Sequence, residues 1–353
     1  MNELFQQKVA DANKVQQTEG MDIMGSLVRS AYSDSAVKRK ISPGQAEKGQ
    51  AGKTTLSDSD ILGNAFVMIV AGHETTANTV HFSLMELATN PGAQRLVQKE
   101  VQAIFGNEAP ENWDYEANIN TLLGGMVGAV MNEELRLMPP VIAIPKRVSK
   151  GSDQDIMIDG KRHTLPAGAQ VALATVCAHR NPKYWPTQPS KISDRPNDLN
   201  DFRPERWLRK PNDGTLNIDE GTDTEDEVNE FEGFTGESSS AQLFHPTRGS
   251  FIPFSDGARS CLGRRLAQVE VMAVLAVIFQ EYSIELAVDE WATDEEVSKM
   301  GDREKRDVYA KAQEKSRRTM RGASTILTLK LQSGFIPVRI VKKGKERFVH
   351  LVD

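Results

Sequence analysis

Residues 254–263 read Phe-Ser-Asp-Gly-Ala-Arg-Ser-Cys-Leu-Gly, and two arginines and an apolar run typical of a helix follow directly. Cys261 therefore stands at the expected N-terminus of a helix, between arginines. The free N–H groups of a helix N-terminus and neighbouring positive charge both favour the thiolate form of a cysteine. Gly257 and Gly263 allow tight turns and let a flat partner approach the backbone closely. These features predict that Cys261 is a ligand or a nucleophile beside a planar molecule.

The same residues bear on other interpretations of Cys261. An isolated cysteine is often a small buried side chain, and that alternative stays open for Cys261. A thiol phosphatase would need an arginine to close a phosphate cradle, but Ala267 stands at that distance. The C-x-x-C-H pattern of covalent haem attachment is absent from the sequence. The second cysteine, Cys177, lies in an apolar run and is expected in the core.

The pattern F-x-x-G-x-R-x-C-x-G is matched by Phe254, Gly257, Arg259, Cys261 and Gly263. It resembles the haem-binding signature of the cytochromes P450. The resemblance implies that the cofactor is haem, iron protoporphyrin IX, and that the Cys261 thiolate is the axial ligand of its iron. It also implies that Arg259 pairs with a haem propionate and that Phe254 and Gly263 line the cofactor.

A second group of residues is the sequence A-G-H-E-T-T at 71–76, inside one long helix expected over residues 57–90. A glycine and two threonines weaken a helix here, and the alternative is a polar turn that faces solvent. The segment is similar to the oxygen-activating helix of the cytochromes P450, A-G-x-E-T. The resemblance implies that Thr75 assists proton delivery to oxygen, that Glu74 relays the proton and that Ala71 lies at the cofactor.

Charged residues mark two further elements. Glu133 and Arg136 stand at i and i+3 on a helix expected over residues 120–137, so they share a face. As an exposed pair they would contribute only about 0–1 kcal/mol. However, E-x-x-R and a later P-E-R-W element are hallmarks of the same family, and the resemblance implies a buried triad completed by Arg206. Arg147, in an extended segment, is a second candidate partner for a propionate, with a solvent-facing strand charge as the alternative.

The remaining pattern predicts a fold that is mainly α with small β-sheets. An apolar helix is expected after the cysteine, and strand-like segments are expected at 141–148, 155–158, 170–173, 326–331 and 335–341. By resemblance, residues 1–353 form a single cytochrome P450-like domain that is incomplete at its N-terminus. Residues 38–56 are expected to form a solvated linker, and the acidic residues 211–247 a disordered insert.

Composition limits the classes of function. A formal net charge of -6 argues against a nucleic-acid partner, whose binding needs a strongly basic face. Two cysteines cannot form a disulfide framework, which fits an intracellular setting. Residues 1–15 are polar, so neither a signal peptide nor a membrane anchor is expected there. Full-length relatives in the family, by contrast, are usually anchored at the endoplasmic reticulum.

The resemblance implies a haem-dependent monooxygenase. Such an enzyme inserts one atom of molecular oxygen into a small apolar organic substrate and takes electrons from a separate NADPH-dependent reductase. Family members carry a longer region before the helix at 57–90, and no tryptophan precedes Trp113 to supply the family's haem-contacting helix. The alternative is therefore a truncated, non-catalytic haem-binding remnant of such an enzyme.

Overall fold

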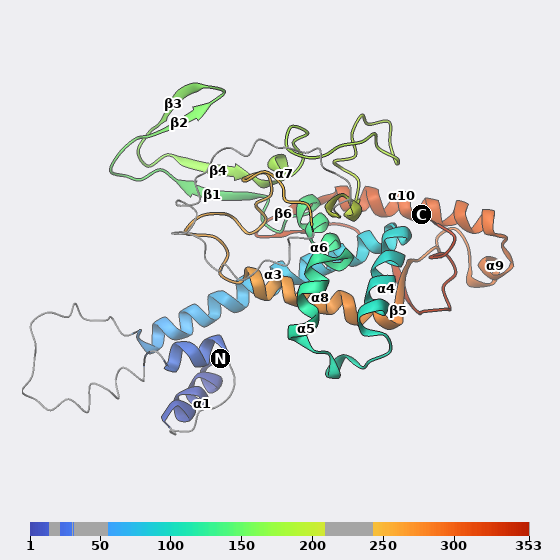
Figure 1. Cartoon of the computed structure of the whole chain (residues 1–353), viewed down its shortest axis with the longest axis horizontal. Coiled ribbons are helices and arrows are strands. Elements are labelled where there is room, and N and C mark those ends of the chain that lie inside the picture. The colour runs from blue at the N-terminus through green and yellow to red at the C-terminus, as the bar shows by residue number, and fades with distance from the viewer. Residues whose placement is uncertain (14–21, 30, 32–55, 209–242, 353) are drawn as a thin grey trace, which may run out of the picture. The chain divides into compact units, whose positions relative to one another are not determined.

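The computed structural model of the chain describes all residues except 14–21, 30, 32–55, 209–242 and 353 (Figure 1). The linker expected at 38–56 lies outside the described residues except for Leu56. The acidic insert expected at 211–247 lies outside them except for 243–247. None of the described helices combines the length and the apolar character that a membrane span requires.

The chain divides into two compact units, Met1–Glu74 and Thr75–Asp353. The first contains α1 (Asn2–Asn13), a helical stretch at residues 23–29 and the N-terminal part of α3 (Asp58–Thr89). Its buried apolar side chains are Phe5, Met24, Val28, Ala31, Ile61 and Ala65. The helix α3 begins as predicted, because the Ser57 N–H donates to Asp60 Oδ2 at 3.0 Å and the Asp60 N–H donates to Ser57 Oγ at 3.2 Å.

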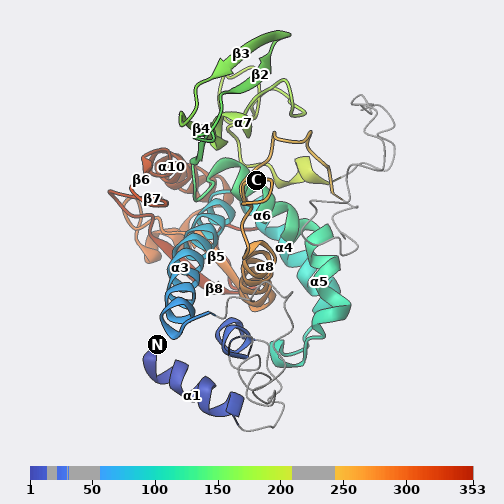
Figure 2. The same ribbon diagram turned by 90° about the vertical axis from the view of Figure 1, so that its left-hand side faces the viewer.

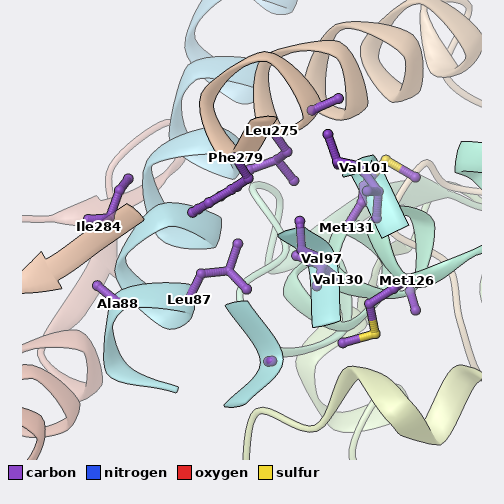
Figure 3. Close-up of a cluster of buried hydrophobic side chains, with 14 of the residues drawn as sticks. Leu87, Ala88, Val97, Val101, Met126, Val130, Met131, Leu275, Phe279 and Ile284 are labelled. Carbon is purple, nitrogen blue, oxygen red and sulfur yellow. The ribbon is translucent and has the colours of Figure 1, made fainter. Parts of the chain in front are cut away.

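The second unit is built mainly from helices around one apolar core. They are α4 (Pro91–Phe105), η1 (Pro110–Asn112), α5 (Tyr115–Gly124), α6 (Met126–Leu137), α7 (Thr175–Ala178), η2 (Pro204–Trp207), α8 (Arg264–Glu281), α9 (Asp294–Lys299) and α10 (Asp302–Arg321). Figure 3 shows the centre of this core, where Leu87 of α3, Val97 of α4, Met131 of α6 and Phe279 of α8 meet, all fully buried. Burying one such side chain contributes about 1.5–3 kcal/mol, so these helices hold one another in place.

The strands of the described part pair two by two, always antiparallel. They are β1 (Ala143–Arg147) with β4 (Gln170–Ala174), β2 (Gln154–Ile158) with β3 (Lys161–Leu165), β5 (Tyr282–Leu286) with β8 (Val338–Lys342), and β6 (Ala323–Thr325) with β7 (Leu329–Leu331). The β2–β3 hairpin projects from the β1–β4 pair in both views (Figures 1 and 2). The predicted fold class, mainly α with small sheets, is confirmed.

The prediction of one helix over residues 120–137 is wrong, because α5 and α6 are separate. Gly125 between them has an extended backbone, with φ -108° and ψ -157°. A Cβ at this position would lie 1.7 Å from Oε1 of Glu100, which comes from α4. Oε2 of the same carboxyl accepts from the Val127 N–H at 2.9 Å. A carboxylate therefore occupies the N-terminus of α6, where the first N–H groups have no partner within the helix.

Candidate functional site

Cys261 lies in a tight loop, residues 252–263, that leads into α8 and that we call the cysteine loop. Its N–H donates to the carbonyl oxygen of Phe254 at 2.8 Å, and the N–H of Ser260 donates to the carbonyl oxygen of Gly257 at 2.9 Å. Ser255 and Gly257 have positive φ angles of 63° and 78°. The loop thus folds back on itself and leaves the thiol of Cys261 exposed. The alternative that Cys261 is a small buried side chain is therefore wrong.

The loop leaves open space at its two glycines. A Cβ built at Gly263 would meet only Sγ of Cys261, at 4.0 Å, and one built at Gly257 would meet nothing within 4 Å. Leu262 and Leu266, one and five residues after Cys261, are 86% and 55% exposed. Exposed apolar side chains gathered around one feature are typical of a surface that a bound group covers. These residues fit a flat apolar group with a metal at its centre that accepts a soft thiolate ligand.

Two arginines lie on the segments that meet at this loop. The strand β1 contacts the loop through Lys146, whose Nζ donates to Ser255 Oγ at 3.1 Å. Arg147 follows on β1, and Arg259 belongs to the loop itself. Both are exposed, and neither guanidinium is paired within the part of the chain that the structure describes. Phe254 packs against the core on one side, with the Arg264 guanidinium 5.6 Å from its ring centre.

The helix α3 runs without interruption through residues 71–76. Ala71 is exposed, and Glu74 and Thr75 are half-buried. Ala71 and Glu74 belong to the first compact unit, whereas Thr75 begins the unit that contains Cys261. The carbonyl oxygen of Thr75 accepts from Oγ1 of Thr79 at 3.0 Å, which is the local competition for backbone groups expected of threonine in a helix.

Glu133, Arg136 and Arg206 come together as a fully buried group. Nε of Arg136 donates to Glu133 Oε2 at 2.8 Å, and Nε of Arg206 donates to Glu133 Oε1 at 2.9 Å. The indole N–H of Trp207 also donates to Oε2 at 2.9 Å, and the backbone N–H of Arg203 donates to Oε1 at 3.0 Å. Burial alone would raise the pKa of Glu133, but the two guanidinium groups outweigh it and hold the pKa at about 2. We call Glu133, Arg136 and Arg206 the buried clamp.

Residue His179 joins the clamp to the cysteine loop, and the sequence assigned it no role. Its Nδ1 lies 3.2 Å from the carbonyl oxygen of Arg136, and the N–H of Ile252 donates to its Nε2 at 2.8 Å. The side chain is fully buried. Cys177, two residues earlier, is exposed, so the prediction that it lies in the core is wrong. Only the order of elements in space could have revealed the contact with Ile252, since 73 residues separate the two partners.

Comparisons with known proteins agree with this site. The family model for cytochrome P450 matches residues 13–307. The chain belongs to the cytochrome P450 family. It is 28% identical to cytochrome P450 monooxygenase prx9 of Penicillium rubens over 296 residues, which covers 81% of this chain and 44% of that relative. It is 29% identical to human cytochrome P450 3A5 over 239 residues, or 68% of this chain and 37% of that relative.

The chain therefore spans less than half the length of the curated P450 proteins that it matches. Haem is the cofactor of this family. The loop around Cys261 fits that group, because it offers a thiol and open space at two glycines. Arg259 of the loop and Arg147 of the neighbouring strand β1 are exposed and have no partner among the described residues. A dianionic porphyrin edge requires cations of the bidentate kind that arginine supplies.

Proposed function

We propose that this P450 chain acts as a haem-dependent monooxygenase with Cys261 as the axial ligand. In this proposal it inserts one oxygen atom of O2 into a small apolar organic substrate, with electrons from an NADPH-dependent reductase. The observation that carries the proposal is the exposed thiol in its glycine loop, with free space at Gly257 and Gly263. An intracellular location is part of the proposal, because Cys177 and Cys261 are both free thiols.

The chain's own residues would hold the cofactor from several elements. Arg259 and Arg147 would pair with the propionates, since both guanidinium groups are exposed and unpaired among the described residues. Gly263 would let the ring lie close to the loop, while Phe254 braces the loop against the core. Ala71, exposed on α3, is a further residue that would contact the cofactor, as the family resemblance implies. When bound, haem supplies the iron that activates oxygen.

Proton delivery is assigned to two residues of α3. Thr75 would hold a proton donor near the reacting oxygen through its hydroxyl, and Glu74 would pass protons to it from solvent. Both side chains are half-buried, so each has access to water on one side and to the protein on the other. The buried clamp has no chemical step in this proposal. Its role is to hold α6 and η2 together.

The first test is the carbon monoxide difference spectrum of the reduced, haem-loaded chain. A strongly red-shifted Soret band is expected for the wild-type chain, and it should be lost in Cys261→Ser. The matched control is Cys177→Ser, because both cysteines are exposed and free. Loss of the band in the control, or its persistence in Cys261→Ser, would contradict thiolate ligation by Cys261.

A haem-binding remnant that does not catalyse is the second candidate. It is favoured by four apolar side chains that α3 leaves exposed, Phe66, Val67, Ile69 and Val70. A reaction site that is open to water protects reactive species poorly. Both candidates predict the red-shifted band, so the test that separates them is turnover. A haem-loaded chain with the band but no reductase-driven product from a panel of apolar substrates would favour the remnant.

A further inference from the structure

His179 has both ring nitrogens engaged at a fully buried position. It ends the short helix α7 and faces two backbone groups from distant parts of the chain. The carbonyl oxygen of Arg136 is 3.2 Å from Nδ1, and the backbone N–H of Ile252 lies 2.8 Å from Nε2. The ring of Phe251 packs against the imidazole with ring centres 5.1 Å apart. Two hydrogen bonds and one ring contact therefore fix the orientation of the imidazole.

These contacts fix one tautomer. A backbone N–H can only donate, so Nε2 must be the acceptor for Ile252. The proton therefore sits on Nδ1, which donates to the carbonyl oxygen of Arg136. Burial is the main cause that lowers the pKa of His179 to about 4, with the nearby Arg136 and Arg180 charges acting in the same direction. The imidazole is thus neutral near neutral pH.

Of the two partners of His179, Arg136 belongs to the buried clamp and Ile252 leads into the cysteine loop. Arg136 is a member of the buried clamp, and its Nη1 also donates to the carbonyl oxygen of His179 at 3.2 Å. Two hydrogen bonds therefore join these residues. Ile252 begins the turn into the cysteine loop, because its carbonyl oxygen accepts from the N–H of Ser255 at 3.1 Å. The carbonyl oxygen of Phe254 then accepts from Cys261.

We propose that His179 is a positioning residue that ties the buried clamp to the cysteine loop and so fixes where the Cys261 thiolate stands relative to the cofactor. This inference rests on the proposed ligation of haem by Cys261. The part of the loop that carries the thiol, residues 255–263, is half-buried or exposed and has two positive φ angles. The hydrogen bond from Ile252 anchors the loop to the fully buried His179, which is itself bonded to Arg136 of the clamp. Loss of that anchor would let the sulfur shift away from the metal.

The test compares three variants of the full chain after haem loading. His179→Phe keeps a flat ring but removes both ring nitrogens. His179→Gln keeps one donor and one acceptor on a side chain of similar reach. Phe251→Leu is the matched control, because it disturbs the packing against the imidazole and leaves its hydrogen bonds in place. The measurements are the carbon monoxide difference spectrum over time and the urea unfolding of each variant without haem.

We expect His179→Phe to bind haem and to convert from the red-shifted band to an unshifted one much faster than the wild-type chain. His179→Gln should restore most of the red-shifted band. Phe251→Leu should unfold at lower urea concentration yet keep the band. A His179→Phe variant that loses stability but keeps the wild-type spectrum would overturn the proposal, because the residue would then serve folding alone.

A measurement on the unmodified chain covers the case in which His179→Phe does not fold. Nuclear magnetic resonance with isotope-labelled histidine should find His179 as the Nδ1–H tautomer, and a proton on Nε2 would exclude the bond from Ile252 and end the proposal. The failure of the wider function is distinguishable. If the wild-type chain shows no red-shifted band at all, ligation by Cys261 falls first and the role of His179 falls with it. If the wild-type chain shows the red-shifted band and the His179 variants keep it as stably, ligation by Cys261 stands and only the role of His179 is wrong.

Discussion

Replacing Glu133 with glutamine is expected to lower the free energy of unfolding near neutral pH by about 3–5 kcal/mol. The change leaves the buried Arg136 guanidinium without its anion and leaves Arg206 with Asp198, at 3.5 Å, as its only carboxylate partner among the described residues. The electrostatics of the site lead to a similar magnitude. The folded chain holds the pKa of Glu133 at about 2, against its usual 4.5. Each pH unit of such a difference corresponds to about 1.4 kcal/mol, so the ionised carboxylate contributes roughly 3 kcal/mol.

The sign of the pH dependence follows from the same two values. Because the pKa is lower in the folded chain, the contribution of Glu133 is complete above pH 4.5 and is lost as the pH falls toward about 2. The glutamine variant does not titrate in this range. The difference in stability between wild type and variant should therefore shrink steadily in acid.

The assay is urea unfolding followed by tryptophan fluorescence. Trp207 bonds directly to Glu133, and Trp185 lies 5.5 Å from the Arg136 guanidinium, so both report on the clamp. The matched control is Glu205→Gln, an exposed glutamate of the same η2 segment, which should change stability by less than about 0.5 kcal/mol. A loss below about 1 kcal/mol for Glu133→Gln, or a gap that stays constant in acid, would refute the reasoning.

Three further changes have defined outcomes. Gly128→Ala should lower the free energy of unfolding in urea by about 1–3 kcal/mol, because its Cβ would lie 2.1 Å from the carbonyl oxygen of Leu123. An unchanged urea midpoint would contradict that contact. Tyr309→Phe should lose about 1–3 kcal/mol in the same assay, since the N–H of Leu286, which donates to the hydroxyl at 3.0 Å, is left unpaired. Glu134 is fully buried without a hydrogen bond in the described part, and burial raises its pKa well above 4.5. The free energy of unfolding should therefore fall as the pH rises from 4.5. Urea unfolding at a series of pH values should show a flatter decline for Glu134→Gln than for the wild type. Equal slopes in the two chains would exclude Glu134 as the origin.

Local signals made much of the fold predictable. The capping pair Ser57 and Asp60 and the breaker Asn90-Pro91 place both ends of α3 to within a residue. These signals act through neighbours in the sequence, so no tertiary information is needed. The break between α5 and α6 was missed because it depends on Glu100, which reaches Gly125 from another helix. A sequence read segment by segment has no access to such a contact.

The helix α10 was missed for a different reason. It is dominated by charged residues, and its buried positions are few, among them Val308, Tyr309 and Ala312. Their spacing of one and four residues is typical of one helix face, so a signal was present. The polar character of the segment, however, is equally typical of a solvated loop, so composition alone does not distinguish the two.

In the candidate site, too, features formed by neighbours in the sequence were predictable and tertiary contacts were not. The motif around Cys261 and the pair Glu133 and Arg136 are compact in the sequence and could be found there. The link through His179 could not, because its partners come from residues 136 and 252. The hydrogen bond from Trp207 to Glu133 is similar, since the P-E-R-W element indicates only that Arg206 lies nearby.

Side chains of α10 bond to the carbonyl groups at the C-terminal end of α3. Carbonyl groups in the last turn of a helix have no partner within it. The hydroxyl of Tyr309 donates to the carbonyl oxygen of Ala88 at 2.7 Å, and Nε2 of Gln313 donates to that of Thr89 at 2.8 Å. Each bond contributes about 0.5–1.5 kcal/mol and both are buried. Thr75 therefore stands at the boundary between this anchored half of α3 and the exposed turns before it.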